Sequence, residues 1–432
     1  MKSRILIAGG FLLALVGLLF WPGRPALTQG LGGRGRYYVP DSSVERAGDN
    51  SVRAHTNHII FLRAATTQVT TPEGLSPATL RSIYNLPVSG PNSGSGVIAI
   101  VDAYNYPTAT ADFNTFSTEF GLPLASATAA NGNPTFEVEY ASGKKPAGNS
   151  SWNLEAALDI EWAHAMAPDA QIILVEANSD SYSDLFTAVK VAGEYVACGG
   201  TSTTCSGGTG EGEVSMSWGG SEFSTEKTYD SYFNQSTVVY MAAAGDTGGE
   251  VSYPSASPDV ISAGGTTLEF SSTTQSAPTF TSEIGWSDGG GGPSKYESVP
   301  SYQSSISGIS SLVGSKRGTP DVSFDADPNS GVSVYESTAY EGESGWWVVG
   351  GTSVSTPSLA GIFNAAAHSY GSSEHSTIYS HYASTPTSDY GTSSYMSSDF
   401  RDITSGKAGK YSAGLGWDFV TGVGSPLTYT GK

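Results

Sequence analysis

The segment Gly350–Pro357 constrains the fold and the chemistry of this chain more than any other. It places Ser353 after a glycine-rich turn and directly before a helix-compatible run, Ser358–Ala367. A serine at the start of a helix lies near the positive end of the helix dipole and near unpaired backbone N–H groups. Both features favour a nucleophilic oxygen and stabilise a nearby oxyanion, so Ser353 is a candidate nucleophile.

Upstream of this segment, apolar strands alternate with helices. Strands are predicted at 97–101, 172–175, 214–218 and 238–242, and helices at 108–119, 152–166, 182–196 and 225–234. Near-continuous apolar strands separated by helices indicate an α/β fold, a mostly parallel sheet with helices on both faces. Beyond residue 266 the chain is rich in Ser, Thr and Gly, and the helix after Ser353 is its strongest regular element. Ser76 and Pro77 suit a helix start, so we expect one domain over residues 76–432.

The N-terminal residues have the features of an export signal. Lys2 and Arg4 precede the apolar run Ile5–Phe20, which is short for a membrane span but suits a signal-peptide core. A signal peptide is therefore predicted over residues 1–26 and a secreted protein with it, with an uncleaved membrane anchor as the alternative. Residues 27–75 show weak periodicity and are predicted to be a linker or a short pro-segment.

Charge and cysteine content exclude several classes of function. The chain carries 40 acidic against 20 basic residues, a formal net charge of −20, which disfavours nucleic acid or an anionic membrane as a partner. The carboxylates would lose their charge at low pH, so this balance is compatible with an acidic environment. Cys198 and Cys205 are the only cysteines. Their closeness in an exported chain favours one local disulfide, and two cysteines are too few for structural zinc.

A nucleophilic serine needs a base, and the six histidines offer no suitable one. The segment around Ser353 resembles the nucleophile motif of subtilisin-like peptidases, but their His-Gly-Thr-His motif is absent. His164 lies on the predicted helix 152–166, where a surface or packing role is expected. The others lie in the N-terminal linker or follow the Ser353 helix: His55, His58, His368, His375 and His381.

Two carboxyls on the helix 152–166 are better candidates. Glu155 and Asp159 are four residues apart and therefore on one face of the helix, among apolar residues. Two close, partly buried carboxyls share a proton, so one can act as a base while the other orients it. A solvated acidic helix face is the alternative interpretation.

Taken together, these motifs resemble the sedolisin family of serine-carboxyl peptidases, which have a subtilisin-like fold. The matching features are Glu155-x-x-x-Asp159, the helix end Ala167–Ile172 and Gly-Thr-Ser353-x-Ser-x-Pro. The resemblance implies that Ser353 is the nucleophile, that Glu155 is its general base and acid, and that Asp159 orients Glu155. It also implies a long pro-domain, which residues 27–75 are too short to form.

Further segments match the family less specifically. Ala243–Gly248 resembles the segment that carries the oxyanion-hole aspartate, here Asp246, which can donate a hydrogen bond only when protonated. Ser217-Trp218 resembles a family motif near the catalytic carboxyls, and Asp102 stands where many relatives carry an outer glutamate. Gly285–Gly289 fits an esterase nucleophile pattern around Ser287, but the glycines that follow it are unsuited to a helix.

A metal site is predicted near the C-terminus. Two carboxylates, Asp402 and Asp418, bracket a glycine-rich loop, and hard oxygen donors of this kind suit Ca²⁺. An acidic turn is the alternative. The run resembles the sedolisin calcium loop, which implies one structural Ca²⁺ held by these two side chains and by the backbone oxygens of Ile403, Gly414 and Gly416.

The sequence thus predicts an exported, acid-active serine-carboxyl peptidase that forms an acyl-enzyme on Ser353. Its expected partners are protein or peptide substrates, cut in endo or tripeptidyl mode, and the chain is expected to be a monomer. We expect no nucleic acid partner and no membrane contact beyond an N-terminal anchor. A non-catalytic binding module on a peptidase fold is the alternative, and a His-dependent peptidase or esterase is a third interpretation.

Overall fold

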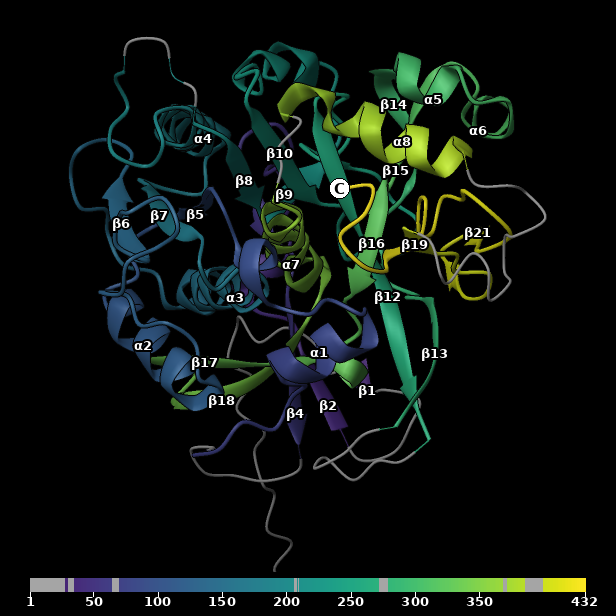
Figure 1. Ribbon diagram of the computed structural model, residues 1–432. Helices are drawn as coiled ribbons and strands as arrows, with labels where there is room; N and C mark the ends of the chain where they lie inside the picture. The colour runs from purple at the N-terminus through teal and green to yellow at the C-terminus, as the bar shows by residue number, and fades with distance from the viewer. Residues whose placement is uncertain are drawn as a thin grey trace, which may run out of the picture.

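A mostly parallel sheet forms the centre of the molecule (Figure 1). The computed structural model describes residues 28–29, 35–63, 70–205, 208, 210–271, 279–367, 371–384 and 399–432. The strand order is β13-β12-β10-β8-β5-β7-β6, with β16 also paired to β12. All these pairs are parallel except β12–β13, which confirms the predicted sheet. The strands are β5 (Val97–Ala103), β6 (Phe136–Tyr140), β7 (Gln171–Ala177), β8 (Gly212–Met216), β10 (Val238–Ala243), β12 (Val260–Phe270), β13 (Phe280–Gly285) and β16 (Val322–Asp325).

Helices cover both faces of this sheet, as predicted. On one face lie α2 (Ala109–Phe120), α3 (Ser150–Met166) and α7 (Thr352–Ala365), and on the other lies α4 (Tyr182–Ala197). Side chains alternate along β5, so Ile98 and Ile100 pack with α3 and α7 while Val97 and Val101 pack with α4. Helix α7 is buried along its whole length, which places its first turn inside the molecule.

One prediction of local structure was wrong. The helix expected at 225–234 is a pair of 3₁₀ turns, Glu226–Thr228 and Asp230–Tyr232. The aromatic rings of Tyr229, Tyr232 and Phe233 gather around Phe186 of α4, so tertiary packing sets their conformation. The region beyond 266 contains regular elements other than the Ser353 helix. Besides the strands above, it contains β14 (Gly292–Ser298), β15 (Lys316–Thr319), β17 (Val332–Tyr340), β18 (Glu343–Gly350), α5 (Ser301–Ser304), α6 (Ser307–Val313) and α8 (Glu374–Ser384).

Residues 35–63 are folded against the domain. In the second sheet, at the bottom of Figure 1, β4 (Ile59–Arg63) lies between β2 (Gly35–Tyr38) and β18, and it pairs antiparallel with both. A short strand, β3 (His55–Thr56), pairs with β9 (Trp218–Ser221). The described part of this segment is therefore packed against the domain. Its role as a short pro-segment stays a prediction.

The remaining elements are short. Ser76 caps α1 (Pro77–Ile83), as predicted, by accepting a hydrogen bond from the Thr79 N–H. Cys198 and Cys205 form the expected disulfide.

The predicted signal peptide, residues 1–26, lies outside the described residues. None of the helices in the described ranges is long and apolar enough to cross a membrane. The other strands are β1 (Thr28–Gln29), β11 (Ser252–Tyr253), β19 (Phe400–Arg401), β20 (Lys407–Ala408), β21 (Tyr411–Ser412) and β22 (Ser425–Pro426).

Candidate active site

Ser353 is the second residue of α7 and is fully buried. Its Oγ donates to the carbonyl oxygen of Ser217, 3.2 Å away. Because Pro357 has no N–H, the helix leaves the carbonyl of Ser353 without its usual partner, and the Ser217 Oγ lies 3.5 Å from that oxygen. The residue before the helix, Gly351, has φ = 108°, a conformation that favours glycine. The turn and the helix together hold Ser353 in a fixed position.

The carboxyls of Glu155 and Asp159 lie on α3, which packs beside α7, and both are buried. The Ser217 Oγ donates to Asp159 Oδ1 at 2.9 Å. Burial raises the pKa of Asp159 well above its usual range, and the neighbouring carboxyls of Asp102 and Glu155 raise it further. Burial likewise raises the pKa of Asp102, with Glu155 adding to the effect. Asp102 and Asp159 are therefore coupled to a neighbouring carboxyl, and burial favours the protonated form of both. The sharing of a proton between Glu155 and Asp159 stays a prediction.

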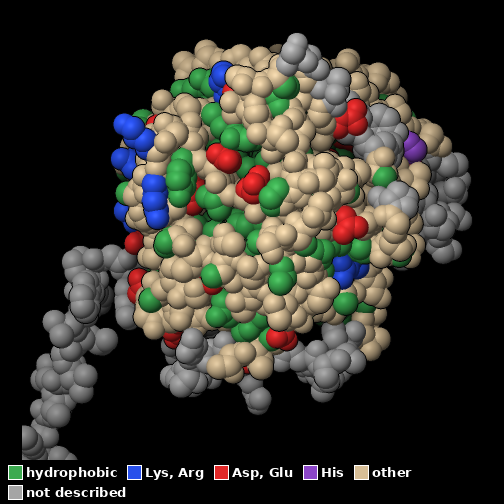
Figure 2. Space-filling view, turned by 60° about the vertical axis from the view of Figure 1, so that its left-hand side comes forward, with side chains coloured by type: hydrophobic (Ala, Val, Ile, Leu, Met, Phe, Trp, Pro, Cys, Tyr) green, Lys and Arg blue, Asp and Glu red, His purple; other side chains and the backbone are tan. Residues whose placement is uncertain are grey.

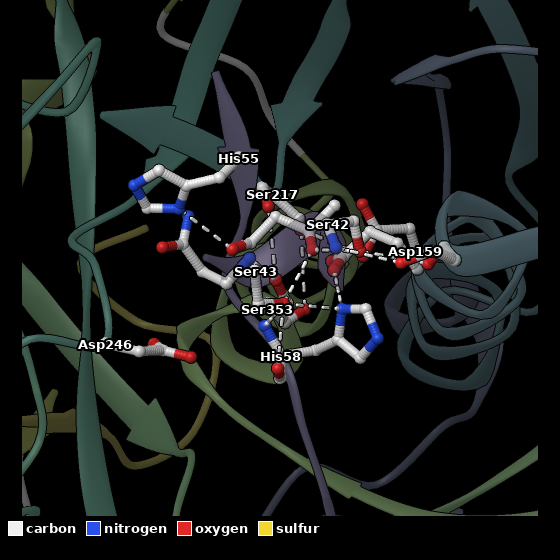
Figure 3. Close-up of polar contacts among 12 residues, drawn as sticks. Ser42, Ser43, His55, His58, Asp159, Ser217, Asp246 and Ser353 are labelled. Atoms are coloured by element: carbon white, nitrogen blue, oxygen red, sulfur yellow. Dashed lines mark hydrogen bonds and ion pairs between the residues drawn. The ribbon is translucent and has the colours of Figure 1, made fainter. Parts of the chain in front are cut away.

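Asp246 follows β10 and faces the first turn of α7. Its Oδ1 accepts hydrogen bonds from the backbone N–H and the Oγ1 of Thr352, both at 2.8 Å. Its Oδ2 is buried and has no hydrogen-bond partner among the described residues. Burial raises the pKa of Asp246 well above its usual range, against the lowering effect of the Thr352 bonds. A protonated Oδ2 is thus available as a donor, and Figure 3 shows this carboxyl turned toward the residues around Ser353.

The segment 55–58 lies directly on these residues. The Ser353 N–H donates to the carbonyl oxygen of Asn57 at 2.9 Å. The Asn57 N–H lies 3.2 Å from both the carbonyl oxygen of Ser217 and the Oγ of Ser353. His58 is buried, and its Nδ1 is hydrogen-bonded to Glu155 Oε2.

Sequence reasoning missed His58, because it assigned this residue to a linker. The apolar run Ile59–Leu62 that follows His58 is a strand signal that could have corrected this. The Oγ of Ser353 is hydrogen-bonded to Ser217 and Asn57 and, among the described residues, to no histidine.

Two other described histidines, His164 and His375, pack against aromatic rings. His164 is a packing residue, as predicted: it stacks against Phe113, its Nε2 lies 2.9 Å from the carbonyl oxygen of Pro123, and burial lowers its pKa to about 4. His375 stacks on Tyr302, and His368 lies outside the described residues.

Ser287 is exposed and lies between the strands β13 and β14. Because no helix follows it, the esterase pattern has no structural support.

The predicted calcium ligands lie together in one loop. Both carboxylate oxygens of Asp402 lie within 3.2 Å of the Gly416 N–H, and Asp418 Oδ2 accepts from the Gly414 N–H at 2.8 Å. Within the described ranges, no hydrogen bond ends on the carbonyl oxygens of Ile403, Gly414 or Gly416. Burial raises the pKa of Asp418 to about 6. Two carboxylates and three uncommitted carbonyls form a donor set that fits Ca²⁺.

Comparison with known proteins agrees with this arrangement. The sequence profile of the Subtilase family matches residues 100–424. Sedolisin from Pseudomonas sp. (strain 101) is 36% identical over 193 residues, which are 40% of this chain and 28% of that protein. Kumamolisin from Bacillus sp. (strain MN-32) is 33% identical over 307 residues, 63% of this chain and 49% of the relative. Xanthomonalisin from Xanthomonas sp. (strain T-22) is 27% identical over 430 residues, 80% of this chain and 48% of the relative.

The chain therefore spans about half or less of the length of these relatives. Among solved structures, Pseudomonas sedolisin (serine-carboxyl proteinase), complexed with two molecules of pseudo-iodotyrostatin, shares the fold. Its TM-score is 0.63 at 22% identity, and the match covers 82% of this chain and 96% of the other. The chain belongs to the subtilase family, and its relatives place it with the sedolisins within that family.

Proposed function

We propose that this protein is an acid-active serine-carboxyl peptidase that hydrolyses peptide bonds in protein or peptide substrates. The observation that carries the proposal is the convergence of three groups at the start of α7. They are the Ser353 hydroxyl, the Ser353 N–H, and an Asp246 carboxyl that burial keeps protonated. A nucleophile beside two preorganised donors is the arrangement that acyl transfer requires.

In the proposed reaction, the Ser353 Oγ attacks the substrate carbonyl and Glu155 accepts its proton. Asp159 orients Glu155, and the cluster with Asp102 retains the shared proton. The negative oxygen of the tetrahedral intermediate accepts hydrogen bonds from the Ser353 N–H and from protonated Asp246. Glu155 then protonates the leaving amine, and water hydrolyses the acyl-enzyme. Loss of the Asp246 proton removes a donor, so activity is expected on the acidic side of neutrality.

A structural calcium ion belongs to the same proposal. The side chains of Asp402 and Asp418 and the carbonyls of Ile403, Gly414 and Gly416 would hold it. The ion would offset the charge of the two carboxylates and fix the loop. Export through residues 1–26, an N-terminal anchor as the alternative, and a monomeric state are parts of the proposal that rest on the sequence alone.

A pH–rate profile with an unfolded protein substrate tests the proposed function. The calcium-loaded protein, first incubated at acidic pH, should cleave most rapidly at acidic pH. Ser353→Ala and Glu155→Ala should each abolish the cleavage. Absence of cleavage at every acidic pH by folded, calcium-loaded protein would contradict the proposal, and so would activity that peaks at neutral pH.

A further inference from the structure

A pocket of about 320 Å³ lies at the end of the central sheet where the parallel strands β5 and β8 begin. Ser353 lies in the first turn of α7, whereas Asn364, which lines this pocket, lies in the last turn of the same helix. Most of the length of α7 therefore separates the pocket from the candidate active site. The lining also includes Asn131, Gly199, Glu211 and Glu213.

Glu213 is the buried charged side chain of this pocket. Only 1% of its surface is exposed, and the Asn364 Nδ2 donates to its Oε2 at 2.7 Å. Within the described part of the chain, no hydrogen bond reaches its Oε1. Helix α7 carries no charged residue, so the charged groups that act most on Glu213 are Glu374 of α8 and Glu211, both acidic. Among the described residues this carboxyl therefore lacks a cationic partner, and its ionised form is costly there.

Two helix ends and the side chains around them make the pocket electronegative. Asn364 lies at the C-terminal end of α7, and Gly199 follows the C-terminal end of α4. Both helix ends carry a partial negative charge. The amide donors of the lining are already committed, Asn364 to Glu213 and Asn131 to Gln171. None of the described lining residues is a lysine, arginine or histidine, so the pocket offers acceptors and negative charge.

These properties define the chemistry of a ligand that would fit. A volume of about 320 Å³ is at the small end of ligand pockets and suits a molecule of amino-acid size, whereas a bare metal ion would fill little of it. Two glutamates repel phosphates and carboxylates. A guanidinium or primary ammonium group brings both a positive charge and several N–H donors, which match a carboxylate and acceptor-rich walls.

From this geometry we propose that the pocket binds a small organic cation, whose guanidinium or primary ammonium group pairs with Glu213 while Glu211 attracts it at the rim. The cation is either a free molecule or a basic side chain of a peptide, and both would present the same group. The inference concerns a second site and does not depend on the peptidase function.

Binding at this site is linked to the loss of a proton. Burial raises the pKa of Glu213 well above its usual range; the Asn364 hydrogen bond opposes this, and Glu374 and Glu211 raise the pKa further. A bound cation favours the ionised carboxylate, so the protein releases a proton when the cation binds. The affinity should therefore rise with pH, and the site should be occupied near neutral pH and lose its ligand in acid.

Calorimetry of the full chain with agmatine, a guanidinium compound without a carboxylate, tests the proposal. Saturable binding is expected at about pH 7, with an affinity that falls about tenfold for each pH unit below it, since one proton is displaced. Titrations in two buffers of different ionisation enthalpy should show the release of a proton. The urea analogue of agmatine, which has the same shape and no charge, should not bind.

A short peptide with one internal arginine and blocked ends distinguishes the two sources of the cation. Binding as tight as that of agmatine would assign the site to basic side chains of peptides. Binding of agmatine alone would assign it to free small molecules.

Three substitutions locate the site. Glu213→Gln keeps the size of the side chain and an oxygen for Asn364, and it should weaken agmatine binding by more than tenfold and abolish the proton release. Glu211→Gln, at the exposed rim, should weaken binding only a few-fold. Glu119→Gln, on the exposed side of α2, is the matched control for net charge and should bind as the wild type does. Melting temperatures check that each variant is folded.

Three results would overturn the inference: no binding of either probe by wild-type protein near neutral pH, equal binding by wild type and folded Glu213→Gln, or tighter binding of Ca²⁺ or Mg²⁺ than of agmatine at this site. If Glu213→Gln does not fold, the proton release of the wild type and the effect of Glu211→Gln decide. None of these measurements uses peptide cleavage, so failure here leaves the proposed peptidase function standing.

Discussion

At the scale of single residues, the two oxygens of Asp246 have different roles. Oδ1 accepts from Thr352, whereas the buried Oδ2 has no partner within the described part of the chain and lies next to Gly351. Asp246→Ala should lower kcat by about 10²–10³, the usual cost of one oxyanion donor. Asp246→Asn should retain most of the activity, because its amide can donate from the Oδ2 position at any pH. Steady-state kinetics on one peptide substrate would measure both, and equal losses would contradict the donor role.

The same residues show what could be predicted from the sequence. Ser353, Glu155 and Asp159 are recognisable because each lies in a short motif of neighbouring residues that the sequence itself displays. The contacts of Asn57 and His58 could not be predicted, since 97 residues separate His58 from Glu155 and 296 separate Asn57 from Ser353. Neither residue belongs to a motif, and only the path of the folded chain brings them to the site.

At the scale of elements, the turn between β18 and α7 fixes the geometry of the site. Gly351 has positive φ, and a side chain there would collide with the Asn57 carbonyl and with Asp246. Gly351→Ala should therefore lower both the melting temperature and the activity, the latter by more than tenfold, because it displaces an oxyanion donor. Gly308→Ala is the matched control: it lies in α6 with open space around it, and it should leave both quantities nearly unchanged. Similar effects of the two changes would refute this role of the turn.

Some helices and strands could be predicted from the sequence, and others could not. The buried parallel strands and the helices α3, α4 and α7 were predicted from apolar runs of suitable length, although α3 and α7 are buried nearly all round. The 3₁₀ turns after Thr225 were missed because aromatic packing against Phe186 overrides local preference there. Strands β2 and β3 were missed because they are short, whereas the apolar run Ile59–Leu62 in β4 is a local signal that was overlooked.

At the scale of the whole molecule, acidic side chains lie both on the surface and in the interior. On the face shown in Figure 2, acidic side chains are scattered among small apolar areas, while basic ones gather mainly along one edge. Inside, a second group of carboxyls lies where α2, α3 and β17 meet: Asp112, Glu161 and Glu336, all buried. Burial raises the pKa of Glu161 well above its usual range and that of Glu336 to about 8. At this place the interior therefore favours the neutral forms of Glu161 and Glu336.

This interior makes the folded state less stable as the pH rises. Between the ordinary glutamate pKa of 4.5 and about 8, unfolded chains lose the Glu336 proton while folded ones keep it. Because the unfolded state then binds fewer protons, the free energy of unfolding falls by about 1.4 kcal/mol per pH unit for each such group. The contribution is fully present below pH 4.5 and is lost as the pH approaches 8.

Glu336→Gln tests this coupling, because glutamine has no proton to lose. Denaturant titrations at several pH values measure the free energy of unfolding. Between pH 4.5 and about 8 this free energy should fall less steeply in the variant, by about 1.4 kcal/mol per pH unit, which is the contribution of one proton. Glu119→Gln, on the exposed side of α2, changes the net charge equally and should leave the slope as it is in the wild type. Parallel curves for wild type and Glu336→Gln would show that Glu336 ionises alike in both states, and the loss of stability toward neutral pH would then have to arise from other buried carboxyls.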